Sequence, residues 1–483
     1  MSRFSQYILA IVLFSFFNMG CAEDRLYYTA PSILPTSFLS VDSSKSSKEI
    51  HRQKQNWQPA SPAERMMKRP GFWISRHPSP DKIILNSQEI LQLNSNIQNE
   101  LKLTQDIIQS SAAYSGQKLR REFEGTLESF LKRKLYADHW SGFPEAFFFD
   151  EIQSNFNLDS IPAVIKPRYG LIVHYANQRF FPTNQGLYAQ KKDIDFDEIQ
   201  NSSLDVGIPV TVLHQSKDGQ WLYTVSSSSS GWVPVQDIAL CSLKELKNFN
   251  HPNFENFLVV TKSKADIFLD QKLTEYYDYA RMGSEFVIQN RVNQNIVAVH
   301  LPLRKEDGRL DLSTGYIQTK DIHEGYWPYT ARHTIGQAFE LLNAPYGWGG
   351  MYGEQDCSAF LQEIFATIGI HLPRNSSAQA QAGKLLEQFD KNFLLKKKLE
   401  LLSTEAVGGA TILPLKGHIM LFLGMVDGHA YAIHATWGYR EHGWLRDRVR
   451  VLNRVVVSDL SLGEGSRKGS LLHRLLSIRF LGK

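Results

Sequence analysis

An alternation of apolar and polar residues over 209–240 constrains the fold of this 483-residue chain more than any other feature. The segment is PVTVLHQSKDGQWLYTVSSSSSGWVPVQDIAL, and it contains Asp218–Gly219 between two apolar runs. A period of two places successive side chains on opposite faces of a strand, and Asp-Gly is a preferred hairpin turn. Short strands joined by tight turns predict a small antiparallel β-barrel here.

A later stretch of the chain repeats this pattern. Alternation resumes at 257–270, and GYIQTKDI at 315–322 echoes GWVPVQDI at 231–238. The two octapeptides occupy equivalent points of their stretches, which indicates a weak internal repeat. We therefore expect two small, SH3-like β-barrels in tandem.

The N-terminus has the pattern of an export signal. Arg3 precedes an apolar run at 7–17, which is shorter than the roughly 20 residues that a membrane-spanning helix needs. Two alternatives remain for its end: cleavage after Ala22, or a lipoprotein signal in which Cys21 is lipidated, although Asn18 departs from the usual leucine. Both alternatives predict an exported protein, either periplasmic or an outer-membrane-anchored lipoprotein.

Composition and periodicity divide the rest of the chain. The segment at 23–75 is polar and has no period, whereas the apolar residues that follow recur at helical spacing. After 329 the pattern becomes α+β, with helices expected at 333–343, 358–369 and 377–390 and strands at 418–424, 429–436 and 446–457. The expected parts are a signal peptide at 1–22, a flexible tether at 23–75, a helical segment at 76–159, SH3-like domains at 160–248 and 249–328, and an α+β domain at 329–483.

Charge and motifs exclude several functions. The formal net charge is +4, and the chain has no basic stripe interleaved with aromatics, no phosphate loop and no HExxH helix. A mildly basic protein suits an anionic environment such as a cell wall. We expect no nucleic-acid partner, no cofactor and no metal site, and we expect a monomer.

Cys357 is the candidate nucleophile. It follows the loop YGWGG at 346–350, and the apolar residues after it recur at helical spacing until Gly369. A cysteine at a helix start lies at the positive end of the helix dipole, which favours the thiolate. The chain has only two other cysteines, Cys21 and Cys241, and the alternative for Cys357 is an inert thiol in the core.

Two histidines downstream are candidate partners for the thiol. His418 begins the apolar segment HIMLFLG, and His434 ends the segment HAYAIH. In a thiolate mechanism His418 would deprotonate Cys357, and His434 would orient His418 as the polar third member. Lone histidines on strands are more often packed core residues, so their mutual geometry must decide.

The length of the turn between the two strands determines whether the histidines lie on the same face of the sheet. The strands are joined across Asp427–Gly428, a hairpin signal. A two-residue loop pairs Val426 with His429 and places the imidazoles on opposite faces of the sheet. A three-residue loop pairs Met425 with His429 and places them on one face. We predict the three-residue loop, because only an odd loop permits the relay.

Together these motifs resemble the NlpC-type cysteine peptidases of bacterial cell walls. The resemblance rests on PYGWGG, DCSAFLQEIFATIGI, LPRNSSAQ, GHIMLFLG and YAIHATWG, and it extends to the preceding helical segment and the pair of SH3-like domains. It implies a papain-like α+β peptidase domain with the triad Cys357, His418 and His434. The substrate it implies is the γ-D-glutamyl–diamino acid bond of peptidoglycan stem peptides.

The resemblance also implies how the substrate is held. In related γ-D-glutamyl-diamino acid endopeptidases, residues matching Tyr346, Asp356 and Ser358 hold the free amine of an N-terminal L-Ala. Asp356 is equally suited to cap the helix. A loop of the first SH3-like domain narrows the cleft in such enzymes, and Asp197 and Glu198 lie in an acidic stretch of that domain.

Two other functions remain open on the sequence alone. SH3-like modules act as binders by themselves, so a wall-binding protein with a lapsed active site is one alternative. The second is a thiol amidase or acyltransferase acting on another substrate, because one scaffold supports several chemistries. The presence of Cys357, His418 and His434 together favours the peptidase.

Overall fold

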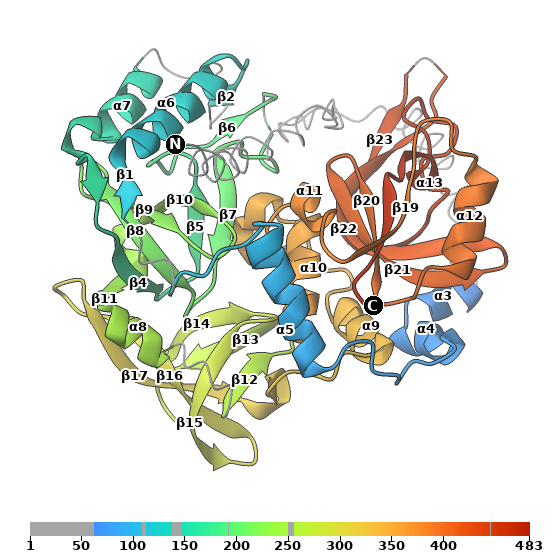
Figure 1. Cartoon of the computed structure of the whole chain (residues 1–483), viewed down its shortest axis with the longest axis horizontal. Helices are drawn as coiled ribbons and strands as arrows, with labels where there is room; N and C mark the ends of the chain where they lie inside the picture. Colours follow the sequence, from blue (N-terminus) through green and yellow to red (C-terminus); the bar gives the residue numbers. More distant parts are fainter. Residues whose placement is uncertain (1–61, 109–112, 138–146, 192, 250–255, 445) are drawn as a thin grey trace, which may run out of the picture.

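The computed structural model describes residues 62–108, 113–137, 147–191, 193–249, 256–444 and 446–483. The expected signal peptide and most of the expected tether lie outside the described residues. Three larger sheets follow one another along the chain (Figure 1). Within the described residues no helix is both long and apolar enough to cross a bilayer.

The first two sheets are the expected barrels, each built from seven antiparallel strands. The first has the order β11-β4-β8-β9-β10-β5-β7, with strands β4 Arg168–Ile172, β5 Ala176–Arg179, β7 Gln200–Leu204, β8 Pro209–Gln215, β9 Trp221–Val225, β10 Ser230–Pro234 and β11 Ile238–Cys241. The second has the order β14-β13-β17-β16-β15-β12-β18, with strands β12 Phe257–Val260, β13 Lys264–Phe268, β14 Tyr276–Arg281, β15 Glu285–Asn293, β16 Ile296–Arg304, β17 Leu310–Gln318 and β18 Ile322–Glu324.

The echo between the two octapeptides has a structural counterpart. In each barrel the octapeptide spans the end of one strand, a single turn of 3-10 helix and the start of the next strand. The two turns are Val235–Asp237 and Thr319–Asp321. Cys241 ends β11 as a half-buried residue, and burial raises the pKa of its thiol to about 12 with help from the charge of Glu245, so this cysteine is an inert one.

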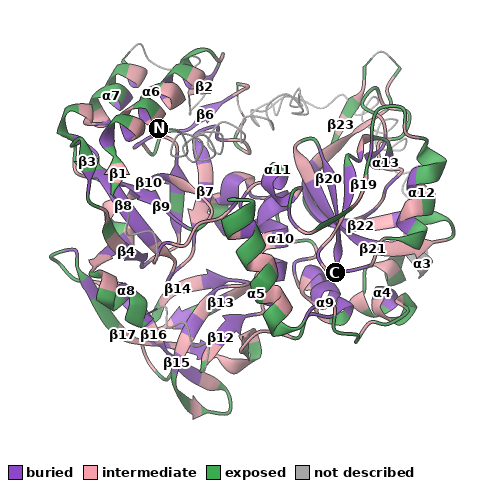
Figure 2. Cartoon of the chain, in the orientation of Figure 1, coloured by how far each residue is buried: buried purple, intermediate pink, exposed green. Residues whose placement is uncertain are grey.

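The C-terminal domain is α+β. Its six-stranded sheet has the order β19-β24-β20-β21-β22-β23, with strands β19 Lys384–Gln388, β20 Thr411–Leu415, β21 His418–Val426, β22 His429–Glu441, β23 Arg448–Asp459 and β24 Ser477–Phe480. Its helices are α9 Ala331–Glu340, α10 Cys357–Ala366, α11 Ser376–Gln379, α12 Leu395–Thr404 and α13 Leu471–Arg474. Helix α10 packs against β21 and β22, and Figure 2 shows buried residues along this helix and along the strands.

The expected tether is wrong for residues 62–75. Helices α3 Pro62–Met67 and α4 Pro70–Arg76 form there, with Pro70 at the first helical position, where a proline lacks no needed N–H. Trp73 is buried, its ring lies 5.4 Å from that of Tyr431, and α4 packs on α9. Burial of the large aromatic side chains Phe72 and Trp73 against the C-terminal domain stabilises these helices, although the composition of the segment is polar.

The expected single helical segment is divided between two domains. Helix α5 Ser87–Ser95 is bound to the C-terminal domain through Asn94, whose side chain donates to Gly369 O and accepts from His371 N. Helices α6 Gly116–Leu131 and α7 Phe148–Asn155 instead contribute to the core of the first barrel, to which α8 Leu243–Phe249, after β11, also contributes. The apolar face of α6, which includes Leu119 and Phe123, is buried there.

The expected helix at 377–390 is also wrong. Only the short helix α11 forms, and residues after Gly383 enter strand β19, which pairs with β24 near the C-terminus. The apolar residues of this segment therefore pack on a sheet whose partner strand lies about a hundred residues away in sequence, which periodicity cannot reveal. The strand expected at 446–457 forms as β23 and lies at an edge of its sheet.

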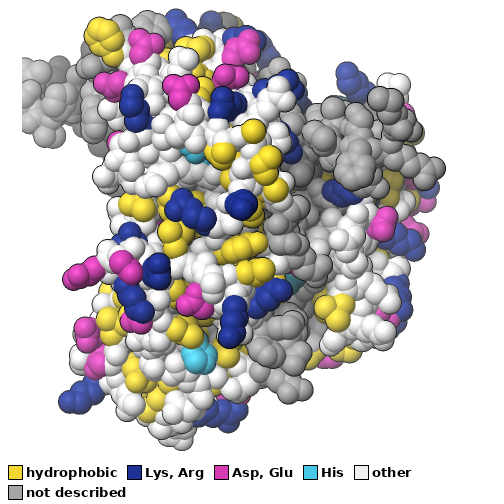
Figure 3. All heavy atoms as spheres, turned by 60° about the vertical axis from the view of Figure 1, so that its left-hand side comes forward, with side chains coloured by type: hydrophobic (Ala, Val, Ile, Leu, Met, Phe, Trp, Pro, Cys, Tyr) yellow, Lys and Arg dark blue, Asp and Glu magenta, His cyan; other side chains and the backbone are white. Residues whose placement is uncertain are grey.

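Charged side chains are mixed over the part of the surface seen in Figure 3. On that face Lys and Arg side chains are interspersed with Asp and Glu side chains among the described residues. This distribution agrees with the small net charge of the chain.

Candidate active site

Cys357 is the first residue of α10, as its sequence position predicts. Asp356 is the N-cap residue, and its Oδ1 accepts from the backbone N–H groups of Ser358 at 3.0 Å and Ala359 at 2.8 Å. The cap satisfies two N–H groups that a helix start leaves unpaired. Cys357 is 6% exposed, so the side chain is enclosed by its surroundings and still retains some surface.

Asp356 also forms a buried ion pair that sequence reasoning did not predict. Arg374 donates to both carboxylate oxygens, from Nη1 to Oδ1 at 3.1 Å and from Nη2 to Oδ2 at 2.7 Å. Burial opposes ionisation of Asp356, but the charge and hydrogen bonds of Arg374 outweigh it, and the pKa of the carboxyl lies below its ordinary value. Asp356 is therefore an anion whose charge is already compensated.

Arg374 brings a positive charge to the nucleophile. Burial disfavours its charged form, yet Asp356 and, more weakly, Cys357 raise the pKa of the guanidinium above its ordinary value. The same side chain donates from Nη1 to Ser358 Oγ at 3.0 Å and from Nε to Ser202 Oγ at 2.9 Å. A fixed cation beside Cys357 favours the thiolate, which adds to the effect of the helix start.

The two histidines lie side by side. His418 Nε2 is 2.7 Å from His434 Nδ1, and the second nitrogen of His434 is 2.9 Å from Ser458 Oγ. Burial lowers the pKa of His434 to about 3, and burial together with the charges of His434 and Arg474 lowers the pKa of His418 well below its ordinary value. Both imidazoles are thus neutral at neutral pH, the form that accepts a proton.

The predicted three-residue loop between the histidine strands is wrong. Val426 pairs with His429, so Asp427–Gly428 form a two-residue turn, and both have positive φ as a type I′ turn requires. The register shifts instead at a bulge between Phe422 and Gly424.

The bulge restores the parity that the turn removes. An extra residue in β21 makes Leu421 pair with Ile433, so His434 follows opposite Met420, on the side of the sheet where His418 lies. The imidazoles therefore meet as predicted, although the irregularity lies in the strand rather than in the turn. Gly424, with φ of 147°, lies at this bulge, and a glycine within a strand often marks one.

The Gly-rich loop before Cys357 contacts the first barrel. Gly350 has φ of 89°, and a Cβ there would lie 2.0 Å from Ser203 Oγ. Gln200 of β7 donates to Gly349 O at 3.1 Å. Glycine is required here because β7 approaches the loop backbone closely, so these residues serve domain docking.

A loop of the first barrel also reaches the C-terminal domain. The ring of Phe196 lies 5.3 Å from Trp348, 5.1 Å from Trp437 and 6.3 Å from Tyr346, and Asp195 Oδ2 accepts from Trp437 Nε1 at 2.9 Å. This loop of the first barrel therefore contacts the C-terminal domain through Asp195 and Phe196.

The acidic pair named from the sequence is structural. Asp197 Oδ2 lies 2.8 Å from Arg179 Nη2, and its other oxygen accepts from backbone N–H groups of its own domain. Glu198 is paired with Arg133. Both carboxylates are therefore buried in ion pairs with arginines.

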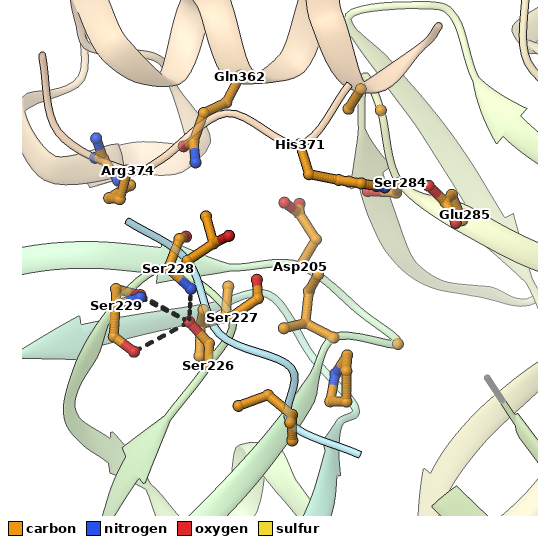
Figure 4. A pocket seen from close by; sticks show the side chains of 18 of the residues that line it. Asp205, Ser226, Ser227, Ser228, Ser229, Ser284, Glu285, Gln362, His371 and Arg374 are labelled. Atoms are coloured by element: carbon orange, nitrogen blue, oxygen red, sulfur yellow. Dashed lines mark hydrogen bonds between the residues drawn. The ribbon is translucent and has the colours of Figure 1, made fainter. Parts of the chain in front are cut away.

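A separate cavity of about 580 Å³ lies where the two barrels meet the back of α10. Figure 4 shows Gln362 and Arg374 from the C-terminal domain facing the serines at 226–229 of the first barrel, with Ser284 and Glu285 of the second nearby. Neither Cys357 nor the two histidines line it. Within the described residues no group of three His, Cys, Asp or Glu side chains is placed to hold a metal ion.

The helix that begins at Cys357 packs on the sheet that carries the two histidines, an arrangement like that of papain-like cysteine peptidases, and SH3-like barrels precede it. Residues 343–397 match the model of the NlpC/P60 family, and residues 187–234 match that of the SH3 domain of SH3b1 type. These two matches fall within the C-terminal domain and within the first barrel, and each agrees with the fold of the part that it covers.

Known proteins agree with this assignment. A γ-D-glutamyl-L-lysine dipeptidyl-peptidase of Bacillus subtilis (strain 168) is 36% identical over 91 residues, which cover 17% of this chain and 31% of the relative. The match therefore spans about a third of the length of that protein. An NlpC/P60 endopeptidase from Photobacterium damselae subsp. piscicida has the same fold, with a TM-score of 0.70 and 21% identity over 84% of this chain and 95% of that one.

Proposed function

We propose that this chain is an exported cysteine peptidase that hydrolyses the γ-D-glutamyl–diamino acid bond of peptidoglycan stem peptides. The observation that carries the proposal is the 2.7 Å contact between His418 Nε2 and His434 Nδ1, on strands against which the helix beginning at Cys357 packs. The name of the Bacillus subtilis relative supports the choice of bond. A coarser statement, cell-wall hydrolase, would also accommodate a different peptide bond.

The reaction proceeds through a thioester. His418 takes the proton of the Cys357 thiol, and the thiolate attacks the γ-carbonyl carbon of the D-glutamyl residue. The amide C–N bond breaks as His418 returns the proton to the departing amine of the diamino acid. Water, deprotonated by His418, then attacks the thioester and releases the γ-carboxylate and the thiol. His434 keeps the His418 ring in position throughout.

Recognition of a free N-terminal amine involves the carboxylates around the site. Tyr346, Asp356 and Ser358 are the residues that the family resemblance assigns to it. Asp356 is compensated by Arg374, so an ammonium group would have to share that carboxylate. Asp195 is a further carboxylate, on the loop of the first barrel that contacts the C-terminal domain. It is partly exposed and accepts a hydrogen bond from Trp437, and we include it among the residues that bind the amine.

The setting of the reaction follows from the N-terminal sequence. We propose that the protein acts outside the cytoplasm, in the periplasm or attached to the outer membrane through lipidated Cys21. We further propose that it acts as a monomer on stem peptides or their released fragments.

The test uses L-Ala-γ-D-Glu-diaminopimelate and the same peptide with an N-acetylmuramyl cap, with purified protein beside Cys357→Ala. Cleavage of the free peptide alone is expected, and it identifies an enzyme that acts on released fragments. Cleavage of both peptides identifies a wall hydrolase without amine selection.

Three results would overturn the proposal. Equal cleavage by Cys357→Ala would remove the thiol from the mechanism. Retention of the protein on insoluble peptidoglycan without cleavage of either peptide would favour the non-catalytic binder, and reaction of the thiol only with other amides or acyl donors would favour an amidase or acyltransferase.

A further inference from the structure

Ser458 forms a hydrogen bond with the histidine pair from a third strand. It lies on β23, is 7% exposed, and pairs in register with Ala432 of β22. Its Oγ is 2.9 Å from His434 Nε2, the ring nitrogen that does not face His418. His434, itself 1% exposed, is therefore bonded at both ring nitrogens.

The directions of the hydrogen bonds along the row His418–His434–Ser458 depend on one another. A neutral imidazole carries one N–H, so it donates at one nitrogen and accepts at the other. His418 Nε2 faces His434, which leaves Nδ1 of His418 to take a proton from a thiol. That requires the N–H of His418 to be on Nε2, donating to His434 Nδ1, and the N–H of His434 to be on Nε2, donating to Ser458 Oγ.

The opposite direction would inactivate the base. If the hydroxyl of Ser458 donated to His434 Nε2, the N–H of His434 would lie on Nδ1 and point at His418 Nε2. His418 would then carry its own N–H on Nδ1, the nitrogen that must accept the proton of the Cys357 thiol. Burial keeps His434 neutral, so the two directions are the alternatives open to the row.

We propose that Ser458 is a positioning residue that, as acceptor from His434 Nε2–H, fixes the tautomer of both imidazoles and leaves His418 Nδ1 able to accept the thiol proton. The inference rests on the proposed function for its catalytic meaning. The tautomers themselves can be measured without any substrate.

The direct experiment is two-dimensional NMR of full-length protein labelled with ¹⁵N in histidine. The expected spectrum has His434 protonated at Nε2 and His418 protonated at Nε2, assigned with the His434→Gln and His418→Gln variants. Protonation of His434 at Nδ1 in the wild-type protein would overturn the proposal, whether or not the protein cleaves peptides. Correct tautomers without peptidase activity would contradict the proposed function alone.

Kinetics supply the second readout. We expect Ser458→Ala to lower kcat about tenfold to a hundredfold, the usual cost of losing a residue that orients a functional histidine, with KM little changed. Ser458→Thr retains the hydroxyl and should retain most of kcat. The matched control is Thr436→Val, which removes a buried hydroxyl from β22 that bonds Gly438 O rather than a ring.

Two kinetic results would contradict the positioning role. One is a Ser458→Ala variant with wild-type kcat and wild-type imidazole shifts. The other is an equal loss in Thr436→Val, which would assign the effect to packing. If Ser458→Ala does not fold, Ser458→Thr and the wild-type spectrum decide the question.

Discussion

The two SH3-like barrels share a fold and differ in what they offer the C-terminal domain. The first sends Phe196 and Asp195 to the aromatic residues beside the candidate site, and its strand β7 contacts the Gly-rich loop. The second contacts the domain through charged side chains, with Lys264 paired to Glu354 and Arg281 placed 3.3 Å from Glu363.

The difference shows how a duplicated fold acquires separate roles. The strand orders and the 3-10 turns within the two octapeptides are alike, whereas the residues that contact the C-terminal domain come from unlike loops and strand ends. We infer that the first barrel forms part of the substrate site and that the second supports α10 from behind. Four predictions test this division, in order of expected effect.

Arg374→Ala should reduce the stability of the protein most. The wild-type Arg374 side chain joins the first barrel to α10 through its hydrogen bonds to Ser202 and Asp356. Removing one partner of a buried ion pair leaves an uncompensated charge and costs about 3–5 kcal/mol. Denaturant unfolding of the whole protein measures this loss. Arg374→Lys keeps the charge and should recover part of it, and an unchanged midpoint in Arg374→Ala would show that the pair does not join the domains.

Phe196→Ala should reduce activity without a comparable loss of stability. Its ring contacts Trp348 and Trp437, and aromatic contacts of this kind contribute about 0.5–1.5 kcal/mol; we expect a loss of that size from the transition state, which lowers kcat/KM by up to about tenfold. The matched control in the second barrel is Phe268→Ala, whose ring contacts Tyr276 of its own domain. Equal losses of kcat/KM in the two variants would contradict the division of roles.

Glu363→Gln should change how stability depends on pH. Burial first, partly offset by Arg281, raises the pKa of Glu363 from 4.5 to about 8. The folded state therefore holds this proton after the unfolded state has lost it, and the stabilisation present below pH 4.5 declines up to about pH 8. Thermal unfolding between pH 5 and 9 should show a shallower decline in the Gln variant, and parallel curves would mean that Glu363 is ionised throughout.

Lys264→Met should have the smallest effect. Its ion pair with Glu354, at 2.7 Å, is partly exposed to solvent. Pairs of this kind contribute about 0–1 kcal/mol, so the unfolding midpoint and kcat should both stay close to wild type. A loss approaching that of Arg374→Ala would make the second barrel as important to the site as the first.

Much of the fold was predictable from local pattern. Alternating strands, the Asp218–Gly219 turn and the helical spacing after Cys357 are short-range signals, and the corresponding elements form. The failures share a cause, since each depends on a distant partner. Trp73 folds a polar segment onto the C-terminal domain, and β19 forms because β24 is available to pair with it.

The histidine pair was predictable from the sequence, and its geometry less so. His418 and His434 were named from sequence, but the bulge at Leu423 that brings them together was assigned to the turn. Arg374 and Ser458 were not named as partners of Asp356 and His434. A buried arginine beside a capping aspartate, and a serine on the strand next to that of His434, give no local signal of their pairing.

The sequence by itself determined which residues are candidates for the chemistry and which segments form barrels, because residue type and short-range period depend only on neighbours in the chain. Tertiary structure decided the orientation of those residues. One extra residue in a strand set the face on which an imidazole lies, and docking of the first barrel supplied the aromatic rim and one partner of Arg374. Such arrangements depend on contacts between residues far apart in the chain, and periodicity does not record them.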